Sequence, residues 1–148
     1  MRPLRLAFFL SPLAALGCVS LTPPSVDVIE FKQAAASPDG RRFEVTLEVS
    51  NPSSVPLPLP EASYRLRVAG LGEYAYIDLP NAVVGALQTQ RLTLPAAISA
   101  GQGELTGETW ELSGSLVYEP DRPLRKFLTE TGSPLPRVFF SGEGSLAP

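Results

Sequence analysis

The sequence contains no histidine and a single cysteine, and both shortages exclude kinds of chemistry. Without histidine the chain cannot build a Ser-His-Asp or Cys-His nucleophile, nor a zinc site with histidine ligands. With one thiol, Cys18, it cannot form an intramolecular disulfide. No Ser-x-x-Lys spacing indicates a lysine-activated serine, and no glycine-rich phosphate loop precedes a helix. We therefore expect a protein that is not an enzyme and that has no catalytic residues, cofactor, metal or small-molecule substrate.

The N-terminus resembles the export signal of a bacterial lipoprotein. Arg2 and Arg5 form a short basic region, and residues 6–16 form an apolar stretch too short to cross a bilayer. This stretch ends in Ala15-Leu16-Gly17-Cys18, which is similar to a lipobox. The alternative is a conventional signal peptide that is cut elsewhere, beside an incidental cysteine. On the lipobox interpretation, residues 1–17 are removed and Cys18 carries the lipid that anchors the protein to a membrane.

The predicted mature chain is acidic. Removal of Arg2 and Arg5 leaves ten basic residues against fifteen acidic ones, a net charge near −5. This balance argues against nucleic-acid binding and against attraction of the whole domain to an anionic bilayer. Val19 follows the cysteine, in place of the Asp that retains many lipoproteins at the inner membrane of Gram-negative bacteria. We therefore expect a location in the cell envelope, at the outer membrane if the source is Gram-negative.

Residues 18–25 form a tether between the lipidated cysteine and the domain. The seven residues after Cys18 reach on the order of 25 Å when extended, and Pro23-Pro24 stiffen part of them. The domain should therefore stay close to its membrane.

Residues 26–148 have the pattern of a single all-β domain. Sixteen prolines and twelve glycines separate short runs in which apolar and polar residues alternate. In the clearest run Phe43, Val45, Leu47 and Val49 share one face. The predicted strands are residues 26–32, 41–50, 63–69, 74–79, 88–94, 108–119 and 137–146. About seven strands without βαβ alternation predict an immunoglobulin-like or fibronectin III-like antiparallel β-sandwich.

The segments between these strands are less clear. Residues 55–60 should be extended without sheet partners, because three prolines occupy them. Residues 81–87 fit a helical turn or a loop, and residues 124–131 are ambiguous. We expect one short helix, near residues 96–101, since glycines soon after would keep it brief.

Three consecutive motifs carry a family resemblance. They are Phe43-x-Val-x-Leu-x-Val49-x-Asn51-Pro52, then Leu57-Pro-Leu-Pro60, then Tyr64-x-Leu66-x-Val68-x-Gly70. Together they resemble the late embryogenesis abundant (LEA) type 2 family, whose domain is also called WHy, for water stress and hypersensitive response. The resemblance continues through Leu92-x-Leu94-Pro95 and the last two strands, over roughly residues 24–147. It implies a β-sandwich, an association with desiccation and stress protection, frequent export as a lipoprotein in bacteria, and no catalytic residues.

Charged residues on the strands are expected to be solvated. Glu44 and Glu48 share one strand face at a separation of roughly 13 Å, which exceeds either glycosidase spacing. Arg65 and Arg67 would complement these carboxylates if the two faces meet. Asp39-Gly40 should be a plain turn, because no run of oxygen ligands for calcium surrounds it.

Phe139 is the residue that we single out for binding. It should point away from the core that Val138 and Phe140 define, either under a covering loop or in an exposed interaction patch. Trp110 and Tyr118 are expected in the core.

Two functions fit these observations. One is a stress-protective envelope lipoprotein that contacts proteins or membranes weakly and broadly. The other is a dedicated interaction module for one envelope protein, in envelope assembly or adhesion. Both have the membrane as a partner through Cys18, together with unknown envelope proteins.

Overall fold

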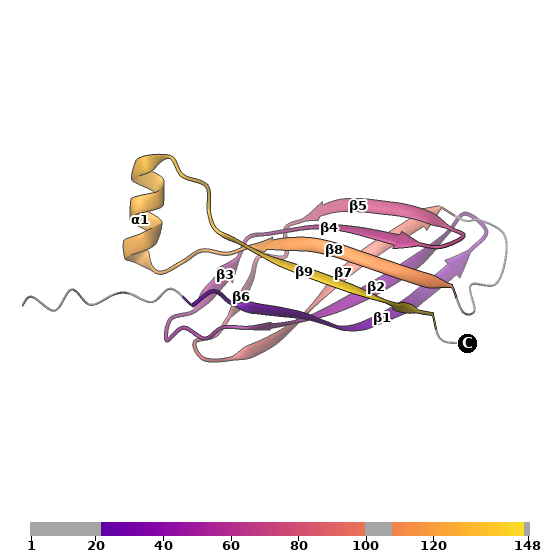
Figure 1. Cartoon of the computed structure of the whole chain (residues 1–148), viewed down its shortest axis with the longest axis horizontal. Helices are drawn as coiled ribbons and strands as arrows, with labels where there is room; N and C mark the ends of the chain where they lie inside the picture. The colour runs from indigo at the N-terminus through magenta and orange to yellow at the C-terminus, as the bar shows by residue number, and fades with distance from the viewer. Residues whose placement is uncertain (1–21, 100–107, 147–148) are drawn as a thin grey trace, which may run out of the picture.

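Nine antiparallel strands and one helix make up residues 22–99 and 108–146, the part of the chain that the computed structural model describes (Figure 1). The elements in chain order are β1 (Ser25–Ser37), β2 (Gly40–Ser50), β3 (Leu57–Leu59), β4 (Glu61–Val68), β5 (Gly72–Asp78), β6 (Ala82–Val84), β7 (Thr89–Ser99), β8 (Thr109–Val117), α1 (Arg122–Thr131) and β9 (Arg137–Ser145).

Two sheets form a sandwich, which confirms the predicted all-β antiparallel fold. One sheet has the order β1-β2-β7 and the other the order β5-β4-β8-β9. At the sides of the sandwich β1 approaches β9, and β5 approaches β7. A small third sheet, β3-β6, lies at one end. The long strands run along the longest axis of the molecule (Figure 1).

The core forms between the faces on which apolar residues alternate. Phe43, Val45, Leu47 and Val49 of β2 are buried as predicted, opposite Leu66 and Val68 of β4. Burying each such side chain contributes about 1.5–3 kcal/mol. Trp110 and Tyr118 are partly buried and pack against this core, with the Trp110 ring 4.5 Å from that of Phe31.

The prediction of a helix near residues 96–101 is wrong, because residues 96–99 continue strand β7. Residues 100–107 lie outside the described part of the chain. Pro95 does not end this strand, because β7 is an edge strand. On an edge strand a proline is tolerated where its missing N–H would face away from the neighbouring strand. The helix is instead α1, in the segment that the sequence left ambiguous. A proline in its first turn starts it, and Gly132, with φ of 67°, ends it in the left-handed conformation.

The two strands beyond the predicted seven are short. Leu57–Leu59 pairs with Ala82–Val84 to make β3-β6, so the prediction that residues 55–60 lack sheet partners is wrong. Pro58 is tolerated because a two-stranded sheet consists of edges alone. The first strand also continues five residues past Lys32, and its register with β2 has one irregularity before Lys32 and one after it.

Asn51 holds the end of the sandwich at which β3-β6 lies. Its side chain is buried, with 3% exposed. The amide nitrogen lies 2.8 Å from the Val55 carbonyl oxygen, 3.3 Å from that of Val84 and 3.0 Å from that of Gly85. The amide oxygen accepts from the Ser53 backbone N–H at 3.0 Å. A single side chain therefore ties the end of β2 to both segments of the small sheet.

We predict that Asn51→Ala lowers the free energy of unfolding by roughly 2–4 kcal/mol, because buried carbonyl groups lose their donor. Chemical denaturation monitored by circular dichroism measures the change. Thr89→Ala is the matched control, since it removes an exposed side-chain hydrogen bond to the neighbouring Ser50; we expect it to cost less than about 0.5 kcal/mol. Equal losses in both variants would contradict this role of Asn51.

Candidate interaction surface

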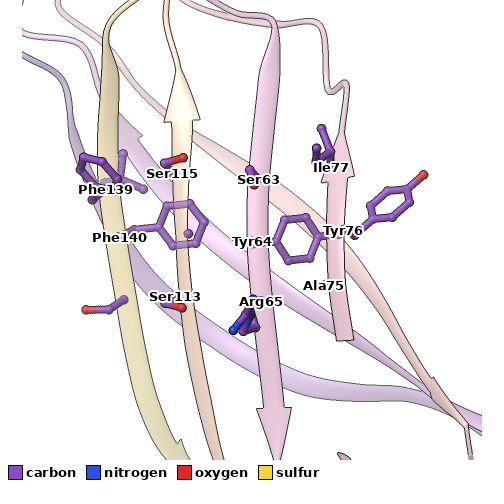
Figure 2. Close-up of a pocket in the computed structure, with 13 residues that line it drawn as sticks. Ser63, Tyr64, Arg65, Ala75, Tyr76, Ile77, Ser113, Ser115, Phe139 and Phe140 are labelled. Atoms are coloured by element: carbon purple, nitrogen blue, oxygen red, sulfur yellow. The ribbon is translucent and has the colours of Figure 1, made fainter. Parts of the chain in front are cut away.

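The outer face of the β5-β4-β8-β9 sheet carries Phe139 in a row of four side chains, one from each strand. In the strand register Ile77 lies opposite Ser63, Ser63 opposite Ser115, and Ser115 opposite Phe139. Figure 2 shows this row, with the two large apolar residues on the edge strands and the two serines between them. The next row in the register is Ala75, Arg65, Ser113 and Ser141.

Small side chains make the middle of this face a depression, which we call the serine trough and define by Ser63, Ser113, Ser115 and Ser141. Its volume is about 1120 Å³, and its lining includes Ile77 and Phe139. Hydroxyl groups on the floor can donate or accept hydrogen bonds, and the edges offer apolar contact. This combination suits an extended ligand that lies across the strands.

Phe139 is exposed, as the interaction patch requires. The exposed fraction of its side chain is 77%, and that of Ile77 is 59%. The neighbours Val138 and Phe140 face the core, as predicted, and Phe140 is 5% exposed.

Gly114 shapes the sheet from below the trough. It lies opposite Phe140 in the register, and the Phe140 ring occupies the space where a side chain at this position would stand. A Cβ added to Gly114 would also approach the Ser63 carbonyl oxygen to 2.6 Å. The missing side chain therefore lets an aromatic ring pack flat beneath β8 (Figure 2).

Ion pairs flank the serine trough. Arg65 lies 3.3 Å from Glu73, and Arg67 lies 3.1 Å from the same carboxylate. At the other end Arg137 contacts Glu61 at 3.1 Å. Exposed pairs of this kind contribute about 0–1 kcal/mol each to the free energy of unfolding. They therefore add little stability, and their main effect is to make both ends of the trough polar.

The expected complement between Arg65 or Arg67 and the carboxylates of β2 is not formed. Glu44 pairs with Lys32 at 3.2 Å, and Glu48 approaches Arg91 at 3.9 Å. The reason is the layer arrangement: β2 and β4 belong to different sheets, whose polar faces point in opposite directions.

Tyr64 connects the two sheets beneath the trough. Its side chain is buried with 3% exposed, and its hydroxyl donates to the Pro95 carbonyl oxygen on the edge of β7. Rings of Tyr74 and Tyr76 lie beside it, at 6.2 and 6.3 Å between centroids. Burial, and secondarily the neighbouring Tyr74 and Asp78, raise the pKa of Tyr64 well above its ordinary value. Burial likewise raises the pKa values of Tyr74 and Tyr118.

These shifts predict a loss of stability in alkali. A raised folded-state pKa stabilises the fold fully below the unfolded value of 10.0, and this contribution is lost as the pH rises through the folded-state pKa. The free energy of unfolding should therefore fall above pH 10, and less steeply in Tyr64→Phe, which we expect to cost about 1 kcal/mol at neutral pH. Urea titrations between neutral pH and pH 11 measure both effects. An unchanged alkaline slope in Tyr64→Phe would contradict the assignment to this residue.

Other residues that the sequence singled out lie apart from the trough. Cys18 and the predicted signal peptide lie outside the described residues. Asp39 lies in the two-residue turn between β1 and β2, and Gly40 is the first residue of β2. Within residues 22–99 and 108–146, no group of three or more acidic or cysteine side chains is placed to hold a metal ion. Over the same residues, no helix has the length and apolarity needed to cross a membrane.

Ile77 and the four serines were not predicted from the sequence to lie on the same surface as Phe139. Alternation assigned Ile77 to a strand, but the pairing that puts it level with Phe139 comes from strands far apart in the chain. A signal was present in Ser113-Gly-Ser115, where three small residues interrupt a strand.

Comparison with known proteins shows that solved structures share this fold. The sequence matches no protein-family model, and it has no significant match among curated proteins. A solution structure described as that of "a putative late embryogenesis abundant (LEA) protein", At2g46140.1, is similar with a TM-score of 0.60 and 17% identity, over 90% of this chain and 76% of that chain. The solution structure of AT1g01470 from Arabidopsis thaliana is similar with a TM-score of 0.53 and 17% identity, over 83% and 82%.

A crystal structure of a protein from Archaeoglobus fulgidus has the same arrangement, with a TM-score of 0.54, 10% identity and coverage of 84% of this chain and 99% of that one. At these identities the likenesses define a shared β-sandwich fold. The chain thus has the fold of a protein described as LEA, which is the fold that its motifs imply.

Proposed function

We propose that this protein is a lipid-anchored protein of the cell envelope, and that its LEA type 2-like β-sandwich protects the envelope against drying without catalysing a reaction. The observation that carries the anchoring is the position of the only cysteine, directly after an apolar segment of signal-peptide length. The fold shared with a protein described as LEA, together with the motifs around Asn51-Pro52, supports the protective role.

The surface of the domain is suited to weak, broad contacts. It presents charged strand faces whose ion pairs are exposed, and one apolar-edged depression. A rigid sandwich on a short tether would keep these faces at the membrane surface, where drying forces proteins and lipids together. The absence of histidine from the sequence is consistent with a role that needs no proton transfer by that residue.

We predict that Cys18→Ser abolishes both the lipid and the protection. Cells grown with a radioactive fatty acid should label the wild-type protein and not the variant. After drying and rewetting, the variant strain should survive as poorly as a strain that lacks the protein, because the unanchored domain diffuses away from the membrane.

The two readouts are separable. Equal labelling of both proteins would overturn the anchor at Cys18. Labelling of the wild type alone, with equal survival of all three strains, would overturn the protective role and leave the anchor standing. Survival of cells kept wet is the control, and should be the same in each strain.

A second candidate function is a dedicated interaction module, and the exposure of Phe139 favours it. Interface hot spots are commonly aromatic residues that fill a pocket in the partner. Phe139 and Ile77 stand at the two edges of the serine trough, so one extended partner would contact both.

On this second function, Phe139→Ala should reduce capture of a single stoichiometric envelope protein by about tenfold or more, the scale of a lost hot spot. The free energy of unfolding should change by less than about 0.5 kcal/mol, because the side chain is exposed. Val83→Ala on β6 is the control, since it truncates an apolar residue that is 52% exposed but lies outside the trough. Equal capture by all three proteins would reject the trough as the binding site.

A further inference from the structure

Helix α1 has an apolar side that is only partly covered, with Leu124 and Leu128 half-buried and Phe127 exposed. Leu124, Phe127, Leu128 and Thr131 follow the spacing i, i+3, i+4, i+7, which places them on one side of a helix. None of the ten residues of α1 is buried, and Phe127 is 58% exposed. In the described part of the chain, no strand packs extensively against α1 (Figure 1). The fold therefore covers part of this side and leaves Phe127 exposed.

The basic residues of α1 are exposed even where they are paired: Arg125 contacts Glu119 at 2.6 Å and Lys126 contacts Glu130 at 3.7 Å, with the cations' side chains 56% and 77% exposed. The helix carries Arg122, Arg125 and Lys126 against one acidic residue, Glu130, so its local charge is +2 within an acidic protein. All three cations lie in its first half, where the helix dipole disfavours positive charge. They project away from the apolar side, as cations do on helices that lie in a membrane interface.

The helix stands at the end of the sandwich where the tether arrives. Ser25, at the start of β1, pairs with Ser50, at the end of β2, next to Asn51. The chain that leaves β8 toward α1 bonds the same end, because the Glu119 N–H donates to the Pro58 carbonyl oxygen at 3.0 Å. Figure 1 shows the start of β1 and α1 at the same end of the long axis. A lipid on Cys18 would hold this end within about 25 Å of the bilayer.

We propose that α1 is a membrane-contacting helix, whose apolar side enters the interface of an anionic phospholipid surface while its cations contact the headgroups. The proposal rests on the lipid anchor of the proposed function. Three apolar side chains would bind a bilayer weakly on their own, but the anchor makes this contact intramolecular and raises its effective concentration to the millimolar range. The helix would then fix the orientation of a domain that the lipid alone merely tethers.

The test is the depth of a tryptophan in the lipidated full-length protein. The protein is reconstituted in vesicles of phosphatidylethanolamine and phosphatidylglycerol whose acyl chains carry bromine, a short-range quencher of tryptophan. Phe127→Trp places the probe on the apolar side, and Thr129→Trp places it on the polar side of the same helix. Trp110 is the internal background, because it lies near the opposite end of β8, roughly 20 Å from the end that leads to α1.

We expect Phe127→Trp to show at least about twice the fractional quenching of Thr129→Trp, because an interfacial helix buries its apolar side by about 5–10 Å. The wild-type protein should show little quenching. Equal quenching of the two variants in protein that floats with the vesicles would overturn the membrane contact and leave the anchor intact. A wild-type protein that carries no fatty acid and does not float would instead overturn the anchor, and this proposal with it.

A second comparison tests the charge. In vesicles of phosphatidylcholine, the quenching of Phe127→Trp should fall toward that of Thr129→Trp, since each basic residue near an anionic surface adds to binding. Quenching that stays the same without anionic lipid would overturn the assignment to anionic headgroups.

Discussion

The buried amide of Asn51 is the constraint on which one end of this molecule depends. It joins the end of β2 to the segments around Val55 and Val84, which are separated in the chain. A two-stranded sheet is marginal in water, so β3-β6 depends on this anchorage and on the burial of Leu57, Leu59 and Val84 in the core. The segment after β8 then bonds to Pro58, and from there the chain enters α1. The small sheet and the chain that leads to α1 thus meet at the end of the sandwich where burial makes the hydrogen bonds of Asn51 strong.

The two ends and the two faces of the sandwich consequently differ in character. The end that Asn51 holds carries the start of β1, the small sheet and helix α1, with its exposed cations. The outer face of the four-stranded sheet has serines in its middle and the apolar Ile77 and Phe139 at its edges, which are features of contact with another molecule. The proposed attachment at this end would leave the long outer faces open. This difference between one end and one outer face of the sandwich is compatible with broad protection at a membrane surface and with the capture of one partner.

The sequence predicted the part of this structure that depends on local alternation. Phe43 to Val49 and Tyr64 to Val68 specify their strands and buried faces, because period-two patterning is read along one segment. The passage of β7 through Pro95 was missed, since it depends on which strand is an edge. The position of α1 was missed although a proline at its start and Gly132 at its end are local signals. The bonds of Asn51 were also invisible, because Val84 and Gly85 lie more than thirty residues further along the chain. Phe139 could be found as an outward-facing aromatic residue, but Ile77 joins it only through the register of four strands.

An anchored sandwich that touches the bilayer with its helical end must stand with its long strands away from the membrane plane. Neutron reflectometry of the lipidated full-length protein on a supported phospholipid bilayer measures this orientation directly. The thirteen residues of β1 span about 43 Å at roughly 3.3 Å per residue, so the protein layer should begin at the headgroups and have a thickness of about 40 Å or more. A solvent layer between headgroups and protein, or a layer about half as thick, would show a domain that floats on its tether or lies flat.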